Sequence, residues 1–324
     1  MATMKDVAEA AKVSVITVSR VINMPDKVKP ATRYKVEQEM KALGFTPNIA
    51  AKNLVSRRTG IIDVYIPESI DLSNPFAMHF ITGISEVLSK QMYSFLILRN
   101  RTHKHLCDGY IITGLLKDEI DDFYRYALEN KRPIVLFGHT ELLSVNCIDV
   151  NNVTGASMAV DHLINLGHKK IAMINVDEDK DYTIDRLAGY HKAFKDNGLP
   201  IPGNSVINAI NNTNGGYEAT LRLLKEEKFS AIFCATDTIA LGAIRAARDL
   251  GKEIPKDLSI VGFDGLGHQL LTNPVITTVQ QPVFRIGSML AELLLDQING
   301  DECSIKKLVE PELLDGNSTA VIRE

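Results

Sequence analysis

The sequence predicts an α/β protein, with a small helical head followed by two doubly wound α/β subdomains. Two features lead to this fold class. Residues 4–23 hold two short runs of helical apolar periodicity. From Gly60 onward, short apolar segments alternate with helical ones, which is typical of parallel sheets covered by helices. A chain of 324 residues with 45% hydrophobic content is long enough for several such units.

The head begins with two predicted helices joined by a tight turn. Their apolar positions are Val7, Ala8 and Ala11, then Val15, Val18, Val21 and Ile22. Thr3 with Asp6 three residues later approaches a capping box, and Ser14 is a candidate N-cap of the second helix. Two short helices of this kind, the second rich in Ser, Thr and Arg, are typical of a helix-turn-helix. An ordinary helical hairpin is the alternative.

A third helix is predicted over residues 30–43, with Pro30 in its first turn and Gly44 just past its end. The residues expected to close a three-helix core are Val36, Met40, Leu43 and Phe45. A domain of about 45 residues buries little surface, so we expect this head to be only marginally stable alone.

Eight strands are predicted after the head, in two series of four. The first series comprises 61–66, 95–98, 110–113 and 134–137, with helices near 76–90 and 118–129. The second comprises 171–175, 206–210, 231–234 and 259–263, with helices near 153–166, 184–197, 215–225 and 238–250. Ligands of open parallel sheets bind beyond the carboxyl ends of the strands. We therefore expect the ligand site in a cleft between the two units.

Charge is distributed unevenly along the chain. The net charge is −4, yet residues 1–60 carry +6 and the remainder carries −10. A basic head on an acidic body is typical of a DNA-reading module, although a solvated basic surface would give the same count. No apolar run reaches the roughly 18 residues of a membrane span, and the N-terminus does not read as a signal peptide. A cytoplasmic protein without membrane contact is expected.

No motif for enzyme chemistry and no cofactor fingerprint is present, so neither an enzyme nor a cofactor is expected. The four cysteines lie far apart, and reduced thiols are expected. His103, His105 and Cys107 fall within five residues, but no second cluster completes a tetrahedral site. We therefore expect no metal.

Five short motifs occur in order along the chain. They are Asp6-Val7-Ala8, Val13-Ser14-x-x-Thr17-Val18-Ser19-Arg20-Val21-x-Asn23, Gly44-Phe45-x-Pro47-Asn48, Ala50-Ala51-x-x-Leu54 and Val261-Gly262-Phe263-Asp264. With these motifs the sequence resembles the lac repressor family of bacterial transcription regulators. The resemblance implies a helix-turn-helix domain over 1–46, a hinge helix and linker over 47–59, and an effector-binding and dimerisation domain over 60–324.

The resemblance also divides the last domain into two subdomains like those of a periplasmic sugar-binding protein, joined by three crossings of the chain. These are expected near 150–152, 279–282 and 308–312. The N-subdomain would then comprise about 60–150 plus 281–309, including a helix over 283–298. The C-subdomain would comprise about 151–280 plus 310–324.

DNA contacts are implied for the second helix. Val15 and Ile16 occupy positions that face base edges in relatives, and as apolar side chains they would touch thymine methyl groups. A core position is the alternative for Val15. Arg20 can reach guanine with two hydrogen bonds. Phosphate contacts are expected from Ser14, Thr17, Ser19, Asn23 and Thr32.

Residues 48–56 form a short Ala-rich stretch that is too short for a stable isolated helix. The resemblance implies a hinge helix that orders on DNA, with Leu54 of each protomer inserted into the minor groove. Lys52 would offset phosphate charge, and Asn48 and Ala51 complete the implied contacts. A plain linker is the alternative.

Arg186 and Asp264 match positions that hold the effector in relatives. Asp264 directly follows the strand 259–263, and an Asp with an Arg facing one cleft suits sugar hydroxyls. Phe233 matches a ring that stacks on the effector, with a ring in the hydrophobic core as the alternative. The implied set is completed by Phe76, Thr236 and Asp237, of which Asp237 could instead be an N-cap. Thr236 replaces a more usual Asn, Gly265 a frequent Asp, and Ala77 a second aromatic residue, so the identity of the effector stays open.

One connection departs from the family pattern. Ten residues join Leu98 to Gly109, where the family carries a helix, and a parallel crossover needs about a dozen residues or more. Either a helix has been lost or a piece is missing. This region borders the dimer interface in relatives, so the geometry there stays open.

The sequence therefore predicts a homodimeric transcription regulator that binds palindromic operator DNA and is controlled by a small-molecule effector, a sugar. A repressor of carbohydrate genes, such as a maltose or other sugar operon, fits best. A catabolite regulator with a phosphorylated carrier protein as corepressor is the alternative. A sugar-transport module is disfavoured by the head, and an enzyme by the lack of a catalytic constellation.

Overall fold

The computed structural model describes residues 2–24, 27–46, 58–100, 105–226, 228–301 and 304–322. The chain divides into two compact units, Met1–Thr59 and Gly60–Glu324. The first is helical and the second contains two sheets, so the predicted α/β fold class is confirmed. No helix in the described ranges is long and apolar enough to cross a membrane.

The first unit contains α1 (Met4–Ala10), α2 (Val15–Asn23) and α3 (Pro30–Ala42). The predicted capping box of α1 is present, because Thr3 Oγ1 accepts from the Asp6 main-chain N–H and Asp6 Oδ2 accepts from Thr3 N–H. The core of the unit consists of Val7, Ala8, Ala11, Val18, Val21 and Val36, with Met40 and Phe45 packed against it. The prediction of Leu43 as a core residue is wrong. It is the C-cap of α3, and its side chain is 40% exposed.

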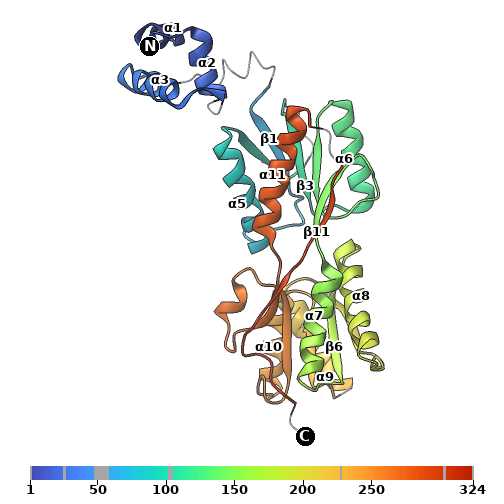
Figure 1. Ribbon diagram of the computed structural model, residues 1–324. Coiled ribbons are helices and arrows are strands. Elements are labelled where there is room, and N and C mark those ends of the chain that lie inside the picture. The colour runs from blue at the N-terminus through green and yellow to red at the C-terminus, as the bar shows by residue number, and fades with distance from the viewer. Residues whose placement is uncertain are drawn as a thin grey trace. The chain divides into compact units, whose positions relative to one another are not determined.

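The second unit contains two six-stranded sheets (Figure 1). The sheet of the N-subdomain has the order β11-β5-β4-β3-β1-β2 and is parallel throughout. Its strands are β1 (Ile61–Tyr65), β2 (Ser94–Leu98), β3 (Gly109–Thr113), β4 (Ile134–Phe137), β5 (Asn146–Val150) and β11 (Lys306–Val309).

Helices cover both faces of this sheet. The helices α5 (Pro75–Lys90) and α11 (Val283–Asn299) pack against each other on one face, where Phe80, Ile84 and Leu290 are fully buried. On the other face, α6 (Lys117–Glu129) buries Phe123 against Tyr110. Two apolar faces explain why β3 and β4 are continuous hydrophobic runs.

The sheet of the C-subdomain has the order β12-β10-β9-β8-β6-β7 and is parallel except for the pairing of β10 with β12. Its strands are β6 (Ile171–Val176), β7 (Val206–Ala209), β8 (Ala231–Cys234), β9 (Ser259–Asp264), β10 (Thr277–Gln280) and β12 (Glu312–Leu314). Its helices are α7 (Asn152–Asn165), α8 (Asp181–Asp196), α9 (Thr213–Glu226), α10 (Asp237–Asp249) and the short 3-10 helix η2 (His268–Leu271).

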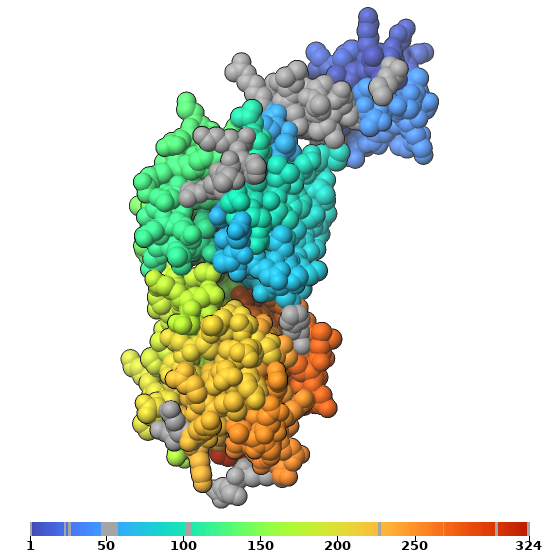
Figure 2. Space-filling model, turned by 180° about the vertical axis from the view of Figure 1, so that it is seen from behind, coloured from blue at the N-terminus to red at the C-terminus, as the bar shows by residue number. Residues whose placement is uncertain are grey.

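The chain passes between the two sheets at three places. These are Asn151 between β5 and α7, residues 281–282 between β10 and α11, and residues 310–311 between β11 and β12. Asn151 Nδ2 donates to Glu310 Oε1 at 2.8 Å, so two of the crossing segments are bonded to each other. Figure 2 shows the two lobes that they join, with residues near 75–140 in one and residues near 200–270 in the other.

Four strands were not predicted, namely β5, β10, β11 and β12. Each carries polar or charged residues, such as Asp149 in β5 and Lys306 in β11, which break the apolar run that identifies a buried strand. The strand β11 pairs on one side only, with β5, and tolerates exposed lysines for that reason.

The connection from β2 to β3 passes over β1, which lies between them in the sheet. Residues 99–100 and 105–108, the described part of this connection, contain no helix. His105 Nε2 bonds to Asp63 Oδ1 on β1 at 2.7 Å, and Asp108 Oδ2 accepts from Gly60 N–H at 2.8 Å. These two hydrogen bonds attach the connection to β1 and to the residue just before it.

Candidate functional site

The helix α2 exposes the side chains that were predicted to read DNA. Val18 and Val21 point into the core, whereas Val15 is 42% and Ile16 is 65% exposed. Arg20 lies on the exposed part of the same helix. Core packing, the alternative for Val15, is therefore not what the structure shows. The first turn of α2 therefore exposes two neighbouring aliphatic side chains to water. An exposed apolar pair of this kind is typical of a surface that a binding partner covers.

Polar residues surround this helix. Ser14 is the N-cap, since its Oγ accepts from Thr17 N–H at 3.1 Å, and the two hydroxyls lie 2.9 Å apart. Ser19 and Thr32 are partly buried at the edge of the unit, and Asn23 is the last residue of α2. The predicted hinge contacts Asn48, Ala51, Lys52 and Leu54 lie outside the described residues.

Arg186 lies on the first half of α8 with only 4% of its side chain exposed. Its Nε donates to Asn152 Oδ1 at 3.0 Å, and its Nη1 donates to the carbonyl oxygen of Ala235. The guanidinium carbon lies 3.7 Å from the centroid of the Phe263 ring. These contacts fix the guanidinium in one orientation.

Asp264 ends β9, at the carboxyl edge of the C-subdomain sheet. Its Oδ1 accepts from Gln281 Nε2 at 2.6 Å and lies 3.7 Å from Arg186 Nη1. Its backbone φ is 130°, a conformation that residues other than glycine rarely adopt. Strain of this kind persists where surrounding contacts determine it, and it is concentrated at functional positions. Arg186 and Asp264, predicted from distant parts of the sequence, are thus brought together.

The side chains of Thr236 and Asp237 form hydrogen bonds to other parts of the protein. The N-cap of α10 is Thr236, whose Oγ1 accepts from Ile239 N–H at 3.2 Å and donates to Asn211 Oδ1 at 2.8 Å. The alternative role of Asp237 as N-cap is therefore wrong. Its carboxylate instead accepts from Thr278 Oγ1 at 2.6 Å and from Gly265 N–H at 2.9 Å, which braces the turn after Asp264.

Phe233 does not lie where a ligand could stack on it. Its side chain is 0% exposed and belongs to the hydrophobic core of the C-subdomain. The prediction of a stacking ring at this position is wrong, the alternative of a core ring is what the structure shows, and we remove Phe233 from the ligand set. Phe76 is partly buried near the N-terminus of α5, with its ring centroid 5.3 Å from that of Phe137.

Two carboxylates beside Arg186 were not predicted. Asp149 lies on β5, and burial raises its pKa to about 7, with a further contribution from the charge of Asp185. Burial also raises the pKa of Asp185, which precedes Arg186 on α8. Asp185 could have been noticed in the sequence, because it directly precedes Arg186, a predicted effector ligand. Asp149 could not, because its strand β5 was not predicted. We refer to Arg186, Asp264, Asp149 and Asp185 as the inter-subdomain site.

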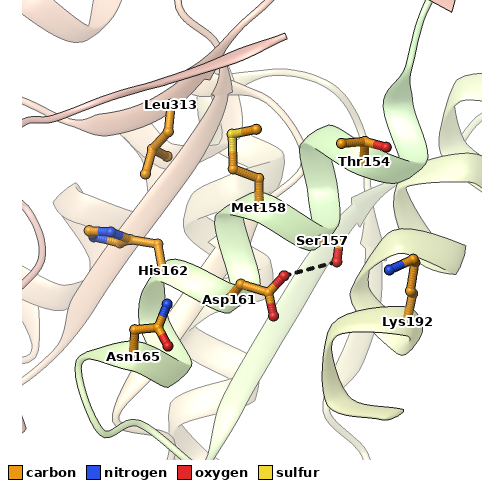
Figure 3. Close-up of a pocket in the computed structure, with 8 residues that line it drawn as sticks. All are labelled: Thr154, Ser157, Met158, Asp161, His162, Asn165, Lys192 and Leu313. Atoms are coloured by element: carbon orange, nitrogen blue, oxygen red, sulfur yellow. Dashed lines mark hydrogen bonds between the residues drawn. The ribbon is translucent and has the colours of Figure 1, made fainter. Parts of the chain in front are cut away.

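A cavity of about 440 Å³ lies elsewhere on the C-subdomain (Figure 3). It is lined by Thr154, Ser157, Met158, Asp161, His162, Asn165, Lys192 and Leu313. Several of its polar groups already have protein partners. Ser157 bonds to Asp161 at 3.1 Å, and His162 bonds to Thr319. It shares no residue with the inter-subdomain site, where the convergent Arg and Asp side chains make the stronger case for a ligand.

The histidines and cysteines of residues 103–107 do not gather into a metal centre within the described ranges, which leave out His103. His105 is bonded to Asp63, and the Cys107 thiol is buried. Burial raises the pKa of Cys107 to about 12, so it is protonated at neutral pH.

Two family models match the chain. The model of bacterial regulatory proteins, lacI family, matches residues 3–48, and that of a periplasmic binding protein-like domain matches residues 160–319. Among curated proteins, the HTH-type transcriptional regulator YvdE of Bacillus subtilis (strain 168) is 39% identical over 98% of this chain and 100% of its own length.

Solved structures are similar as well. A complex of the transcriptional regulator CelR with cellobiose has a TM-score of 0.74 and 29% identity, covering 98% of this chain and 100% of that one. The lac repressor dimer bound to operator and the anti-inducer ONPF has a TM-score of 0.74 and 26% identity, covering 98% and 99%.

Proposed function

Because the chain belongs to the lacI family of bacterial regulatory proteins, we propose that it is a cytoplasmic repressor of carbohydrate genes. It acts as a homodimer on a palindromic operator, and a sugar held at the inter-subdomain site controls it. The observation that carries the proposal is the exposed pair Val15 and Ile16 on a helix whose other face forms the core of a basic head.

On DNA, the two aliphatic side chains offer contact to thymine methyl groups and Arg20 offers two hydrogen bonds to a guanine. Ser14, Thr17, Ser19, Asn23 and Thr32 are proposed to contact phosphates and set the register. The surplus of cations in residues 1–60 supports the electrostatic part of the affinity. A dimer would present two such helices to half-sites one helical turn apart.

For the effector, Arg186 and Asp264 are the proposed ligands, with Phe76 as the aromatic side chain of the opposite subdomain. An Asp and an Arg can each form two hydrogen bonds with neighbouring hydroxyls of a sugar. The solved complex of the similar regulator CelR with cellobiose supports a sugar as the class of effector. Binding there would couple to DNA affinity by a free energy on the order of 1–3 kcal/mol.

Selection from a random duplex library, with the full chain, tests the DNA part. We expect a palindromic sequence to be enriched, and the Arg20→Ala variant to bind it about 10- to 100-fold more weakly, since one bidentate base contact is worth about 1–3 kcal/mol. The exposed Arg125→Ala, on α6, is the matched control. Absence of any enriched palindrome would refute the proposal.

The effector part is tested on the same operator. A sugar that stabilises the protein thermally should change operator affinity, and both effects should vanish in Arg186→Lys. The alternative, a catabolite regulator, predicts that a phosphorylated carrier protein strengthens operator binding whereas free sugars leave it unchanged.

A further inference from the structure

Two aromatic rings lie over the guanidinium group of Arg186. Its central carbon is 3.7 Å from the centroid of the Phe263 ring and 4.9 Å from the centroid of the Tyr182 ring. Both distances fall within the range of cation–π attraction, about 6 Å, and this attraction is strongest where water is excluded. Arg186 meets that condition, because its side chain is almost fully buried. The rings therefore help the hydrogen bonds of Arg186 to orient the guanidinium.

The two rings differ in how they are held. Phe263 is the residue before Asp264 on β9, and its side chain is fully buried in the core of the C-subdomain. Tyr182 is only partly buried, in the first turn of α8, four residues before Arg186. Residues four apart are neighbours on the surface of a helix, so α8 itself brings this ring to Arg186. The Phe263 ring is fixed by core packing, whereas the Tyr182 ring needs further contacts to keep its place.

The carboxylate of Glu178 provides such a contact. Tyr182 Oη donates to Glu178 Oε2 at 3.2 Å, and Lys180 Nζ lies 2.8 Å from the same oxygen. Thr183 Oγ1 donates to the carbonyl oxygen of Lys180 at 2.7 Å, within the turn that leads into α8. The residues just before and within the first turn of α8 thus hold the Tyr182 ring by its hydroxyl end.

The first turn of α8 also contacts the opposite subdomain. Asp181, next to Tyr182, pairs with Lys117 at the start of α6, with 3.2 Å between Asp181 Oδ1 and Lys117 Nζ. Lys117 belongs to the N-subdomain and Asp181 to the C-subdomain. The ring that covers Arg186 is therefore carried by a turn at the boundary between the two subdomains, where the effector is proposed to bind.

We propose that Tyr182 is a positioning residue of the inter-subdomain site, whose ring holds the guanidinium of Arg186 in place and keeps water from it. With rings lying over it, the guanidinium offers a ligand its N–H groups, in the plane of the group, and not its face. A hydrogen bond formed there is strengthened because the surroundings contain little water. The inference rests on the proposed function, since it takes Arg186 as a ligand of the effector.

Nuclear magnetic resonance tests the positioning without any ligand. In the full chain with isotope-labelled arginine, the Nε–H signal of Arg186 is assigned by its loss in Arg186→Lys. In Tyr182→Leu this signal should shift, and its exchange with water should become about tenfold faster, because the covering ring is gone. Tyr182→Phe retains the ring and should preserve the signal. An Arg186 signal that is the same in Tyr182→Leu as in the unmodified chain would overturn the inference.

Calorimetry with glucose, maltose and cellobiose measures the consequence for the effector. The sugar that binds the unmodified chain should bind Tyr182→Leu about tenfold more weakly and Tyr182→Phe within about threefold. Equal losses in the two variants would show that the hydroxyl matters and the ring does not, which also overturns the inference. If none of the three sugars binds the unmodified chain, the proposal of a sugar effector fails, whereas the Arg186 signal still decides whether Tyr182 positions this residue.

Tyr217 offers a matched control. Its ring centroid lies 4.9 Å from the guanidinium carbon of Arg245, and its hydroxyl donates to Asp249 Oδ2 at 3.0 Å. These contacts are of the same kind but lie between α9 and α10, and they include no residue of the inter-subdomain site. Tyr217→Leu should therefore leave the Arg186 signal and the sugar affinity unchanged. A loss as large as that in Tyr182→Leu would mean that any missing ring of the C-subdomain weakens binding, against a specific role of Tyr182.

Discussion

Arg186 Nη1 lies 3.7 Å from Asp264 Oδ1, although 78 residues of chain separate the two. Each belongs to a different element, the helix α8 and the end of the strand β9. The parallel order of β6, β8 and β9 places the carboxyl end of β9 near the start of the helix that follows β6. The topology thus creates a charged pair at the sheet edge where ligands of such folds bind.

Removal of the Arg186 guanidinium should destabilise the second unit. Arg186→Ala leaves the Asn152 amide oxygen and the Ala235 carbonyl without their donor and Asp264 without its cation. We expect the free energy of unfolding to fall by about 3 kcal/mol, as for other broken buried pairs. Urea denaturation measures this change. Arg125→Ala, at an exposed pair, should change stability by less than about 1 kcal/mol. Equal effects of the two variants would contradict the structural role given to Arg186.

The contact between α7 and α8 should not tolerate a methyl group at Gly189. A Cβ at this position would meet the Val153 carbonyl oxygen and lie 2.7 Å from Ala156 Cβ. We expect Gly189→Ala to lower the free energy of unfolding by about 1–3 kcal/mol, through displacement of α8. Gly203→Ala is the control, because a Cβ there has no neighbour within 4 Å. Effector binding should weaken in Gly189→Ala as well, since α8 carries Arg186.

The stability of the second unit should fall as the pH rises from about 4 to about 7. Burial raises the pKa of Asp149 to about 7, well above its value of about 3.9 in an unfolded chain. Between these two pKa values the folded protein holds a proton that the unfolded chain has released, so stability falls with rising pH and levels off once the pH has passed the folded pKa. His162 and His168 have pKa values lowered by burial, so their own contributions oppose this decline and raise stability as the pH rises toward about 6.5.

Thermal denaturation across this pH window measures the effect. Asp149→Asn keeps the shape of the protonated carboxyl and removes its titration, so the decline should become shallower in this variant. Asp122→Asn should follow the unmodified chain. A decline of the same steepness in all three proteins would mean that Asp149 does not titrate as its surroundings predict.

The prediction for the hinge concerns Leu54, and this prediction rests on the sequence alone. If paired leucines open a minor-groove step, Leu54→Ala should weaken operator binding about 100-fold, a loss on the order of 3 kcal/mol. Calorimetric binding of the effector should be unaffected, because the second unit is unchanged. Operator affinity equal to that of the unmodified chain would eliminate the insertion mechanism.

The helical head could be predicted because its signals are local. The N-cap at Ser14, the capping box at Thr3 and the periodicity of Val18 and Val21 each span a few residues, and the structure reproduces all three. The apolar strands of both subdomains were predictable for the same reason, since burial on two faces leaves an uninterrupted hydrophobic run. Arg186 and Asp264 came from their resemblance to family positions, and no local pattern joins them.

Tertiary structure decided what depends on contacts between distant segments. The strand β5 exists because β4 and β11 pair with it on either side, although its own sequence includes Asn146 and Asp149. Two residues show the consequence. The ring of Phe233, which was predicted to contact the ligand, lies in the core. The carboxylate of Asp149, which was not predicted to have a role, interacts electrostatically with Arg186. A sequence determines which segments can be buried, whereas the partners that a buried group meets are set by the packing of the whole chain.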